Sequence, residues 1–87
     1  MVKAAKIWER IRANPRGDWT IEDILKVAGS VEGIRHRRHR GSHHHFGFPG
    51  VTEICTVVER KPIKPIYIKK FVTFMDEVRN AKEQRDE

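Results

Sequence analysis

The fold of this chain is decided by the stretch Ile34-Arg35-His36-Arg37-Arg38-His39-Arg40-Gly41-Ser42-His43-His44-His45-Phe46, followed by a Pro49-Gly50 turn and a β-branched run from Val51 to Val58. Strand-like residues around glycine-containing turns predict three strands joined by two tight hairpins, with the consecutive histidines on the middle strand. Because side chains alternate between the two faces of a strand, His43 and His45 share one face and His44 lies on the other. At least one imidazole is therefore expected to be exposed beside a row of arginines.

Three helices are predicted around these strands from the spacing of apolar residues. Thr20 is the expected N-cap of the second helix, and Gly33 is its expected C-terminal cap. Pro65 lies near the first position of the last helix, where proline is favoured. In chain order, the predicted elements are helix 2–13, helix 20–31, strand 34–38, strand 42–48, strand 52–58 and a last helix that begins near residue 65 and reaches residue 78.

The order helix, helix, three strands, helix predicts an α+β fold in which a three-stranded antiparallel sheet packs against helices on one face. At 87 residues the chain is expected to be one domain, spanning 1–87. Its core is 19–79, preceded by an extra N-terminal helix at 2–13 and followed by a tail, 80–87, that is expected to fray. The other face of the sheet then presents histidines and arginines to solvent.

The charge of the chain favours a polyanionic partner. Lysine and arginine total 18 against 12 acids, a formal net charge of +6. Four of the arginines fall between residues 35 and 40, a segment without an acid, which exceeds what solubility requires. Nucleic acid is the favoured partner, although an acidic protein could cover the same residues.

Cysteine content and hydropathy exclude several kinds of site and segment. Cys55 is the one cysteine, so an intramolecular disulfide and a cysteine-based zinc site are excluded, and its apolar neighbours predict a small buried residue. Apolar runs are too short to span a membrane, and a signal peptide is not recognisable, so the cytoplasm is the expected compartment.

The histidine cluster has three interpretations on residue pattern alone. An imidazole titrates near neutral pH and suits general acid–base chemistry, and phosphodiester cleavage needs such a group beside fixed positive charge. A zinc site is a second interpretation, although consecutive strand residues diverge and the cluster has no cysteine or carboxylate to complete four ligands. Solvated histidines on a basic strand are the third. The possible nitrogen donors are His36, His39, His43, His44 and His45.

Three motifs in this order resemble the HicA family, the RNA-cleaving half of a bacterial or archaeal toxin–antitoxin pair. They are Asn14-Pro15 followed by Trp19-Thr20-Ile21-Glu22-Asp23, then Gly41-Ser42-His43-His44-His45-Phe46, then Lys61-Pro62-Ile63-Lys64-Pro65-Ile66-Tyr67. The resemblance covers roughly residues 14–78. It implies a fold like a double-stranded RNA-binding domain, messenger RNA as substrate, and a HicB-type antitoxin as partner in a hetero-oligomer.

The resemblance also implies that a histidine of the Gly-Ser-His run is catalytic. His43 matches that position, and His44 is the second candidate because adjacent histidines blur the register. The family often has Pro-x-His at the end of its third strand, where this chain has Val58-Glu59-Arg60. A second histidine is thus missing at that place, and Arg60 replaces it only in part.

These observations predict a metal-independent endoribonuclease (an mRNA interferase) that needs no cofactor, because RNA carries its own nucleophile in the ribose 2′-hydroxyl. His43 is expected to transfer the proton, while Arg37, Arg38 and Arg40 hold the phosphate. The expected RNA-contacting residues are Arg35, Arg37, Arg38, Arg40, Ser42, Arg60 and Lys61. Two alternatives use the same basic face: a non-catalytic RNA- or DNA-binding module, and an interaction protein that binds an acidic partner.

Overall fold

The computed structural model describes residues 3–85, which form three helices and one sheet. The elements are α1 (Ala4–Ala13), α2 (Ile21–Gly29), β1 (Arg35–His39), β2 (His43–Gly47), β3 (Cys55–Val58) and α3 (Pro65–Arg85). The predicted α+β class and the order of elements are confirmed. Residue 2 of the predicted first helix, and residues 86 and 87 of the predicted tail, lie outside the described range. Within that range, no helix has the length and apolar character needed to cross a membrane.

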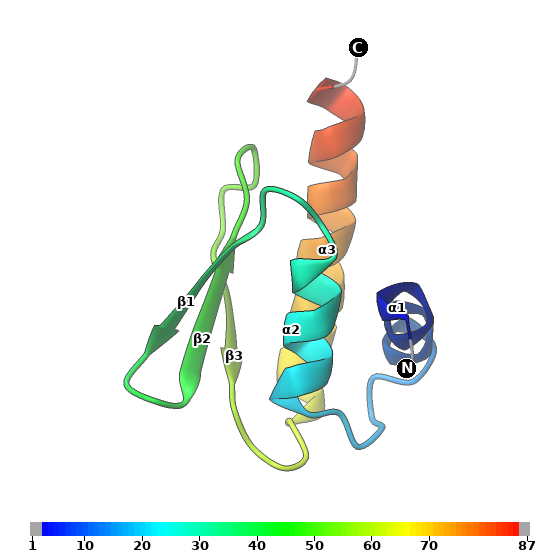
Figure 1. Ribbon diagram of the computed structural model, residues 1–87, viewed down its shortest axis with the longest axis vertical. Helices are drawn as coiled ribbons and strands as arrows, with labels where there is room; N and C mark the ends of the chain where they lie inside the picture. The colour runs from blue at the N-terminus through cyan, green and yellow to red at the C-terminus, as the bar shows by residue number, and fades with distance from the viewer. Residues whose placement is uncertain (1–2, 86–87) are drawn as a thin grey trace.

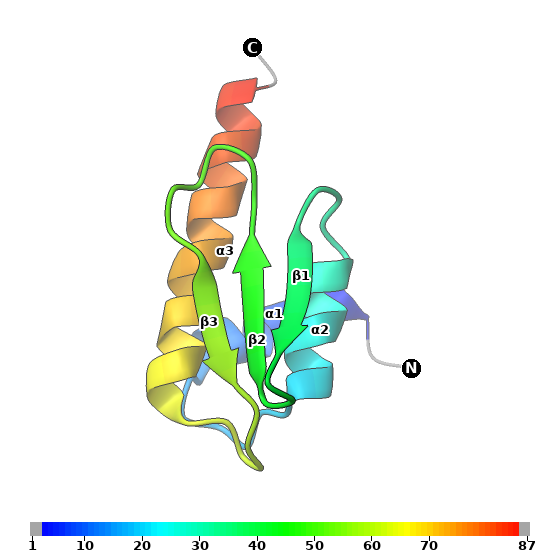
Figure 2. The same cartoon turned by 90° about the vertical axis from the view of Figure 1, so that its left-hand side faces the viewer.

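The molecule has two layers, a sheet and a group of helices on one of its faces (Figure 1). The strands are antiparallel in the order β1-β2-β3, so β2 is central and both neighbours are edges. α2 and α3 cover one face, α3 lies along β3, and α1 packs against α2 and α3. The opposite face of the sheet is not covered by a helix of the described residues (Figure 2).

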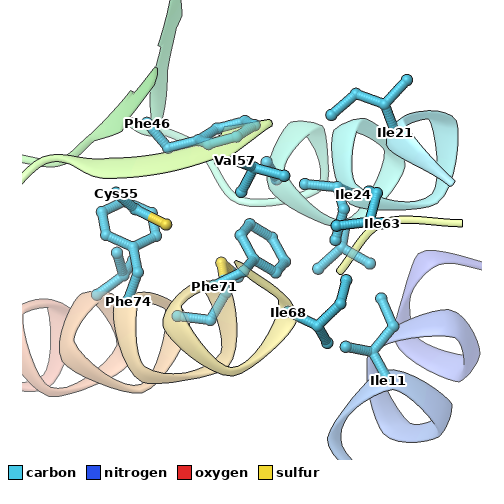
Figure 3. Packing of buried hydrophobic residues seen from close by; sticks show 14 of the residues in the cluster. Ile11, Ile21, Ile24, Phe46, Cys55, Val57, Ile63, Ile68, Phe71 and Phe74 are labelled. Atoms are coloured by element: carbon cyan, nitrogen blue, oxygen red, sulfur yellow. The ribbon is translucent and has the colours of Figure 1, made fainter. Parts of the chain in front are cut away.

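The core lies between the sheet and the helices (Figure 3). Phe46 of β2 is fully buried, and its ring meets Phe71 of α3 edge to face, with 5.7 Å between the ring centroids. Val57 of β3 and Ile24 of α2 are fully buried in the same cluster. Burying aromatic and branched side chains of this size contributes about 1.5–3 kcal/mol each. The core therefore fixes which side of β2 faces inward.

The register of the sheet divides its side chains into two sets. Phe46 points into the core, and residues paired across antiparallel strands share a face. The inward set is His36, Arg38, His44, Phe46, Cys55 and Val57. The outward set, which we call the open face, is Arg35, Arg37, His39, His43, His45, Thr56 and Val58. The predicted separation of His43 and His45 from His44 is confirmed.

The strand bounds and one connection differ from the prediction, and β2 is one residue shorter than predicted at each end. β1 is one residue later than expected, the third strand begins at Cys55 rather than residue 52, and the connection before it spans residues 48–54 instead of forming a tight hairpin. Pairing begins only where Cys55 meets Phe46, and residues 48–54, which contain the Pro49-Gly50 turn with φ +94° at Gly50, lie outside the ladder. Ile54, which falls inside the predicted strand 52–58, is outside β3 and 67% exposed.

Two helix ends also differ from the prediction. α2 ends at Gly29, where the Ser30 hydroxyl donates to the Val27 carbonyl at 2.6 Å, two residues before the predicted end. Gly33, the predicted cap, lies in the following turn at φ +99°, where a Cβ atom would come within 2.9 Å of the Phe48 ring. α3 ends at Arg85, beyond the predicted end at residue 78, and its last turns contain strong helix formers.

The predicted N-cap of α2, Thr20, is confirmed. The Thr20 hydroxyl accepts a hydrogen bond from the Asp23 backbone N–H, and the Asp23 carboxylate accepts one from the Thr20 backbone N–H. This reciprocal capping box satisfies two backbone donors at the helix N-terminus. The adjacent Trp19 carbonyl accepts from the Ile63 backbone N–H at 2.9 Å, which joins the start of α2 to the segment that enters α3.

Candidate nucleic-acid interface

The open face carries positive charge and imidazoles, without a carboxylate among its outward strand side chains. Arg35, Arg37 and His39 of β1 project from it, and His43 and His45 of the central strand lie between them and β3. Such a face attracts a polyanion, because the positive charges on it are not neutralised by strand neighbours. The arginine-rich strand β1 is exposed along its whole length.

The imidazoles of the open face lie close to one another. His39 and His43 are Cα partners at the last pair before the β1–β2 turn. The rings of His39 and His45 have centroids 6.0 Å apart. His45 Nδ1 lies 3.0 Å from the Thr56 hydroxyl, whereas His43 Nδ1 lies 3.5 Å from the Ser42 hydroxyl, the limit of a hydrogen bond. His43 is thus held less firmly than His45 and is half-exposed.

Two grooves border the open face. The first, of about 610 Å³, lies between β3 and α3 and includes His43, Tyr67 and Lys70. The second, of about 710 Å³, follows β1 and includes Arg35, Arg37, His39 and His45. The exposed Ile54 lines both. An extended ligand that crosses the sheet therefore meets guanidinium groups and imidazoles on the strands, and both lysines (Lys69, Lys70) and carboxylates (Glu53, Glu77) in the first groove.

His44 is not available to a ligand. It is 2% exposed, and both of its ring nitrogens have partners. His44 Nε2 lies 2.9 Å from Glu59 Oε1, and His44 Nδ1 lies 2.8 Å from His36 Nε2. His44 therefore joins the end of β3 to β1 across the inward side of the sheet. A proton on its ring reaches solvent only through one of these neighbours.

The positions of the hydrogen atoms in the Glu59–His44–His36 chain can be deduced from the carboxylate at one end. The Glu59 carboxylate only accepts, so His44 Nε2 carries a hydrogen, and a neutral His44 accepts at Nδ1 from the His36 Nε2–H. The hydrogen bond from His44 lowers the pKa of Glu59, and the neighbouring Arg38 guanidinium lowers it further. Desolvation lowers the pKa of His36, and so do the charges of His44 and Arg38.

The structure separates the arginines that were predicted to act together. Arg37 lies on the open face, but Arg38 points to the other side, where its guanidinium contacts Glu59 at 3.2 Å and its Nε donates to the Gly41 carbonyl at 2.7 Å. Arg40 lies in the β1–β2 turn at φ +53°. Arg35 and Arg37 are the arginines that share a face with His43.

The other predicted RNA contacts lie at one end of the sheet. Ser42 is half-buried in the β1–β2 turn, and its carbonyl accepts from the Glu59 backbone N–H at 2.7 Å. Arg60 and Lys61 are exposed in the segment after β3. The structure therefore places these three residues near the hairpin end, and only Ser42 approaches an open-face histidine, His43.

His36 and Glu59 have structural partners that the sequence did not indicate. His36 lies opposite Phe46, so the register places it diagonally beside His44. The predicted β1–β2 hairpin could therefore have indicated the contact between His36 and His44. The contact of Glu59 depends on the path of the chain after β3, for which the residue pattern has no signal. Lys70 and Tyr67 in the first groove were also not predicted as site residues, because they come from α3.

Neither a metal nor a thiol centre is apparent in residues 3–85. Over that part of the chain, no three His, Cys, Asp or Glu side chains are arranged to hold a metal ion. Cys55 is buried, and burial raises the pKa of its thiol to about 12. It packs as a small apolar residue, as predicted, and is not a nucleophile at neutral pH.

Comparison of the chain with protein-family models, with curated proteins and with solved structures finds no match in any of the three. The open face, its grooves and the sequence motifs are therefore the features that bear on function.

The histidine–carboxylate chain predicts that the protein loses stability in acid. The folded state lowers the pKa of His36 from its usual 6.5, so the unfolded chain binds more protons, and stability declines as the pH falls through that value. The lowered pKa of Glu59 adds a second decline as the pH falls through 4.5 and below. Urea denaturation across this pH range measures both.

In the same experiment, His36→Gln should reduce the loss of stability as the pH falls through 6.5. Glu59→Gln should reduce the loss of stability at pH 4.5 and below. His39→Gln is the matched histidine control, because His39 lies on the open face outside this chain of groups. A free energy of unfolding that rises as the pH is lowered from 7 to 5 contradicts this account of the inward side.

Proposed function

We propose that this protein is the toxin of a toxin–antitoxin pair, an endoribonuclease that cleaves single-stranded messenger RNA in the cytoplasm without a metal ion. The observation that carries the proposal is the position of His43, a half-exposed imidazole on a sheet face that has outward arginines and lacks carboxylates. The resemblance of three motifs to the HicA family supports it. The order α2-β1-β2-β3-α3 fits the double-stranded RNA-binding-domain-like fold that this resemblance implies.

The protein does not need a nucleophile of its own for this cleavage, because RNA supplies the nucleophile. The ribose 2′-oxygen attacks the adjacent phosphorus, a new 2′-oxygen–phosphorus bond forms, and the bond from phosphorus to the 5′-oxygen breaks. The products are a 2′,3′-cyclic phosphate and a free 5′-hydroxyl. The protein holds the phosphate, transfers protons and offsets the negative charge of the crowded phosphorus.

His43 is the proton-transferring residue in this proposal, and His44 has a structural role. His43 lines the groove between β3 and α3 and has at most a weak contact to Ser42, so its ring can meet a substrate. His44 is buried with both nitrogens engaged. Replacing His44 removes the partner that Glu59 and His36 share.

Positive groups on both sides of His43 hold the RNA backbone. Arg35 and Arg37 lie on the open face, and Lys70 lies in the groove beside His43. Guanidinium groups suit phosphate oxygens because they donate two parallel hydrogen bonds. Arg40, Ser42, Arg60 and Lys61 extend this surface at the hairpin end, whereas Arg38 is paired with Glu59 on the other side.

The antitoxin of this proposal, a HicB-type protein, covers the open face in a hetero-oligomer and thereby excludes RNA. Ile54 and Ile66 support a protein contact there, because they are large apolar residues, 67% and 57% exposed, and both line the groove that contains His43. Exposed apolar residues surrounded by polar ones are typical of protein interfaces.

A non-catalytic RNA- or DNA-binding module is the second candidate function, and one observation favours it. The position after β3 is occupied by a carboxylate, Glu59, rather than by a histidine, and this carboxylate is held by His44 and Arg38. The end of the third strand therefore supplies no second imidazole for catalysis. The same open face then binds the phosphate backbone without cutting it. Cleavage of a labelled RNA separates the two functions.

The central catalytic prediction concerns His43. His43→Ala is expected to lower the rate of cleavage of a labelled single-stranded oligoribonucleotide by about 100-fold or more, because a positioned acid or base contributes that much. The protein should stay folded, since His43 is outside the core cluster. Gel analysis gives the rate, and treatment of the product with acid identifies the cyclic phosphate.

Two controls sharpen this assay. Excess EDTA is included throughout, and a loss of cleavage that zinc or magnesium restores contradicts the metal-independent mechanism. His44→Ala is compared at a temperature where it remains folded. If His44→Ala is inactive while His43→Ala cuts at the wild-type rate, the histidine assignment is off by one residue. Full activity of both variants contradicts histidine catalysis altogether.

The arginine prediction concerns binding. Replacing Arg35 and Arg37 together with alanine should weaken RNA binding about equally across sequences. It should also lower the log–log salt slope by about 1.4, since each phosphate contact on a single strand contributes about 0.7. Arg38→Ala is the matched control, because Arg38 faces Glu59 rather than the open face. Titration at several salt concentrations checks this, and an unchanged slope for the double variant means that these arginines are only solvated.

A further inference from the structure

Cleavage of RNA requires two proton transfers, and His43 can perform only one of them at a time. One proton leaves the 2′-hydroxyl, and another reaches the departing 5′-oxygen. A second acid–base group on the same face is therefore needed for full rate. The end of β3 lacks one, because Glu59 is bound to His44 and the next residue is Arg60.

The cross-strand neighbour of His43 meets this need. His39 and His43 are directly opposite in the register of β1 and β2, and both project from the open face. Residues directly opposite in an antiparallel pair have Cβ atoms about 4.5–5.5 Å apart, so the two imidazoles can flank one phosphate group. His39 is exposed, and within residues 3–85 neither of its ring nitrogens has a hydrogen-bond partner.

We propose that His39 is the second proton-transferring residue of the cleavage reaction and works as a pair with His43. The inference depends on the ribonuclease function proposed above and adds a residue to it. One imidazole accepts the 2′-hydroxyl proton as the 2′-oxygen–phosphorus bond forms. The other, as imidazolium, donates a proton to the 5′-oxygen as its bond to phosphorus breaks. The pair ends with one proton, as it began, but on the other ring.

His45 is the nearest competitor for this role, because its ring centroid lies 6.0 Å from that of His39, but two features make it less suitable as the partner of His43. Its Nδ1 is engaged by the Thr56 hydroxyl, and it lies on the same strand as His43, two residues along, rather than directly across from it. His36 is excluded from the pair because it lies on the inward side and contacts His44. Arg37, in the next cross-strand pair, is placed to offset charge on the phosphate.

The groups around the pair set its pH dependence. Those on the sheet and its turn are Arg37, Arg40 and His45, and those in the groove beside β3 are Glu53, Tyr67, Lys69, Lys70 and Glu77. Two imidazoles with opposite protonation states predict a bell-shaped dependence of kcat/KM on pH. Each single variant of the pair should lose one limb of the bell.

Two substrates with different leaving groups test the pair. The first is a single-stranded oligoribonucleotide, whose 5′-oxygen must be protonated as it leaves. The second is uridine 3′-(4-nitrophenyl phosphate), whose nitrophenolate leaves without a proton. His39→Gln and His43→Gln should each lower kcat/KM on the oligoribonucleotide by about 100-fold or more. One of the two variants, the one that lacks the acid, should recover most of its activity on the nitrophenyl ester.

His45→Gln and Glu32→Gln are measured beside them, the first as the competing imidazole and the second as an exposed residue away from the sheet. His39→Asn repeats the test with a shorter side chain, and circular dichroism confirms that each variant is folded. If His39→Gln cleaves RNA within threefold of the wild type while His43→Gln does not, the pairing is overturned and the proposed ribonuclease stands. The pairing is also overturned if His45→Gln regains activity on the nitrophenyl ester while neither His39→Gln nor His43→Gln does. A wild-type protein that cuts neither substrate overturns the ribonuclease itself.

Discussion

The burial of Phe46 against Phe71 is the constraint on which the rest of the structure depends. Strand side chains alternate, so fixing this one aromatic ring in the core fixes the direction of every other residue on β2. His44 must then point inward, and His43 and His45 must point outward. A slip of one residue would bury two imidazoles and expose the phenyl ring. The same packing therefore stabilises the fold and presents the histidines.

The sheet separates two groups of histidines that are adjacent in the chain. On the inward side, His44 binds Glu59 and His36, and because its nitrogens are satisfied its burial is tolerated. On the open side, His39 and His43 have weak contacts or none and remain available to a ligand. A buried polar chain thus holds the end of β3 in place, while the imidazoles of the open face project toward solvent.

Local features of the sequence predicted much of this arrangement, and long-range features did not. Strand alternation predicted the opposite directions of His43 and His44, and the pattern at Thr20 predicted the start of α2. The contact from His44 to Glu59 depends on where the chain goes after β3, and no local pattern encodes that path. Ile54 was assigned to a strand by its β-branched character, but pairing begins only at the next residue, Cys55. Arg38 was grouped with Arg37 by proximity in sequence, although alternation separates them.

The central claim is that the open face binds single-stranded RNA, and NMR titration tests it most directly. A 2′-O-methyl oligoribonucleotide, which lacks the free hydroxyl and cannot be cleaved, is added to ¹⁵N-labelled protein. The account predicts saturable shifts at the backbone amides of β1 and β2, centred on Arg37, His39 and His43, with little change at Ile24 of α2. Shifts concentrated on the helices, or no saturable change at any amide, would contradict it.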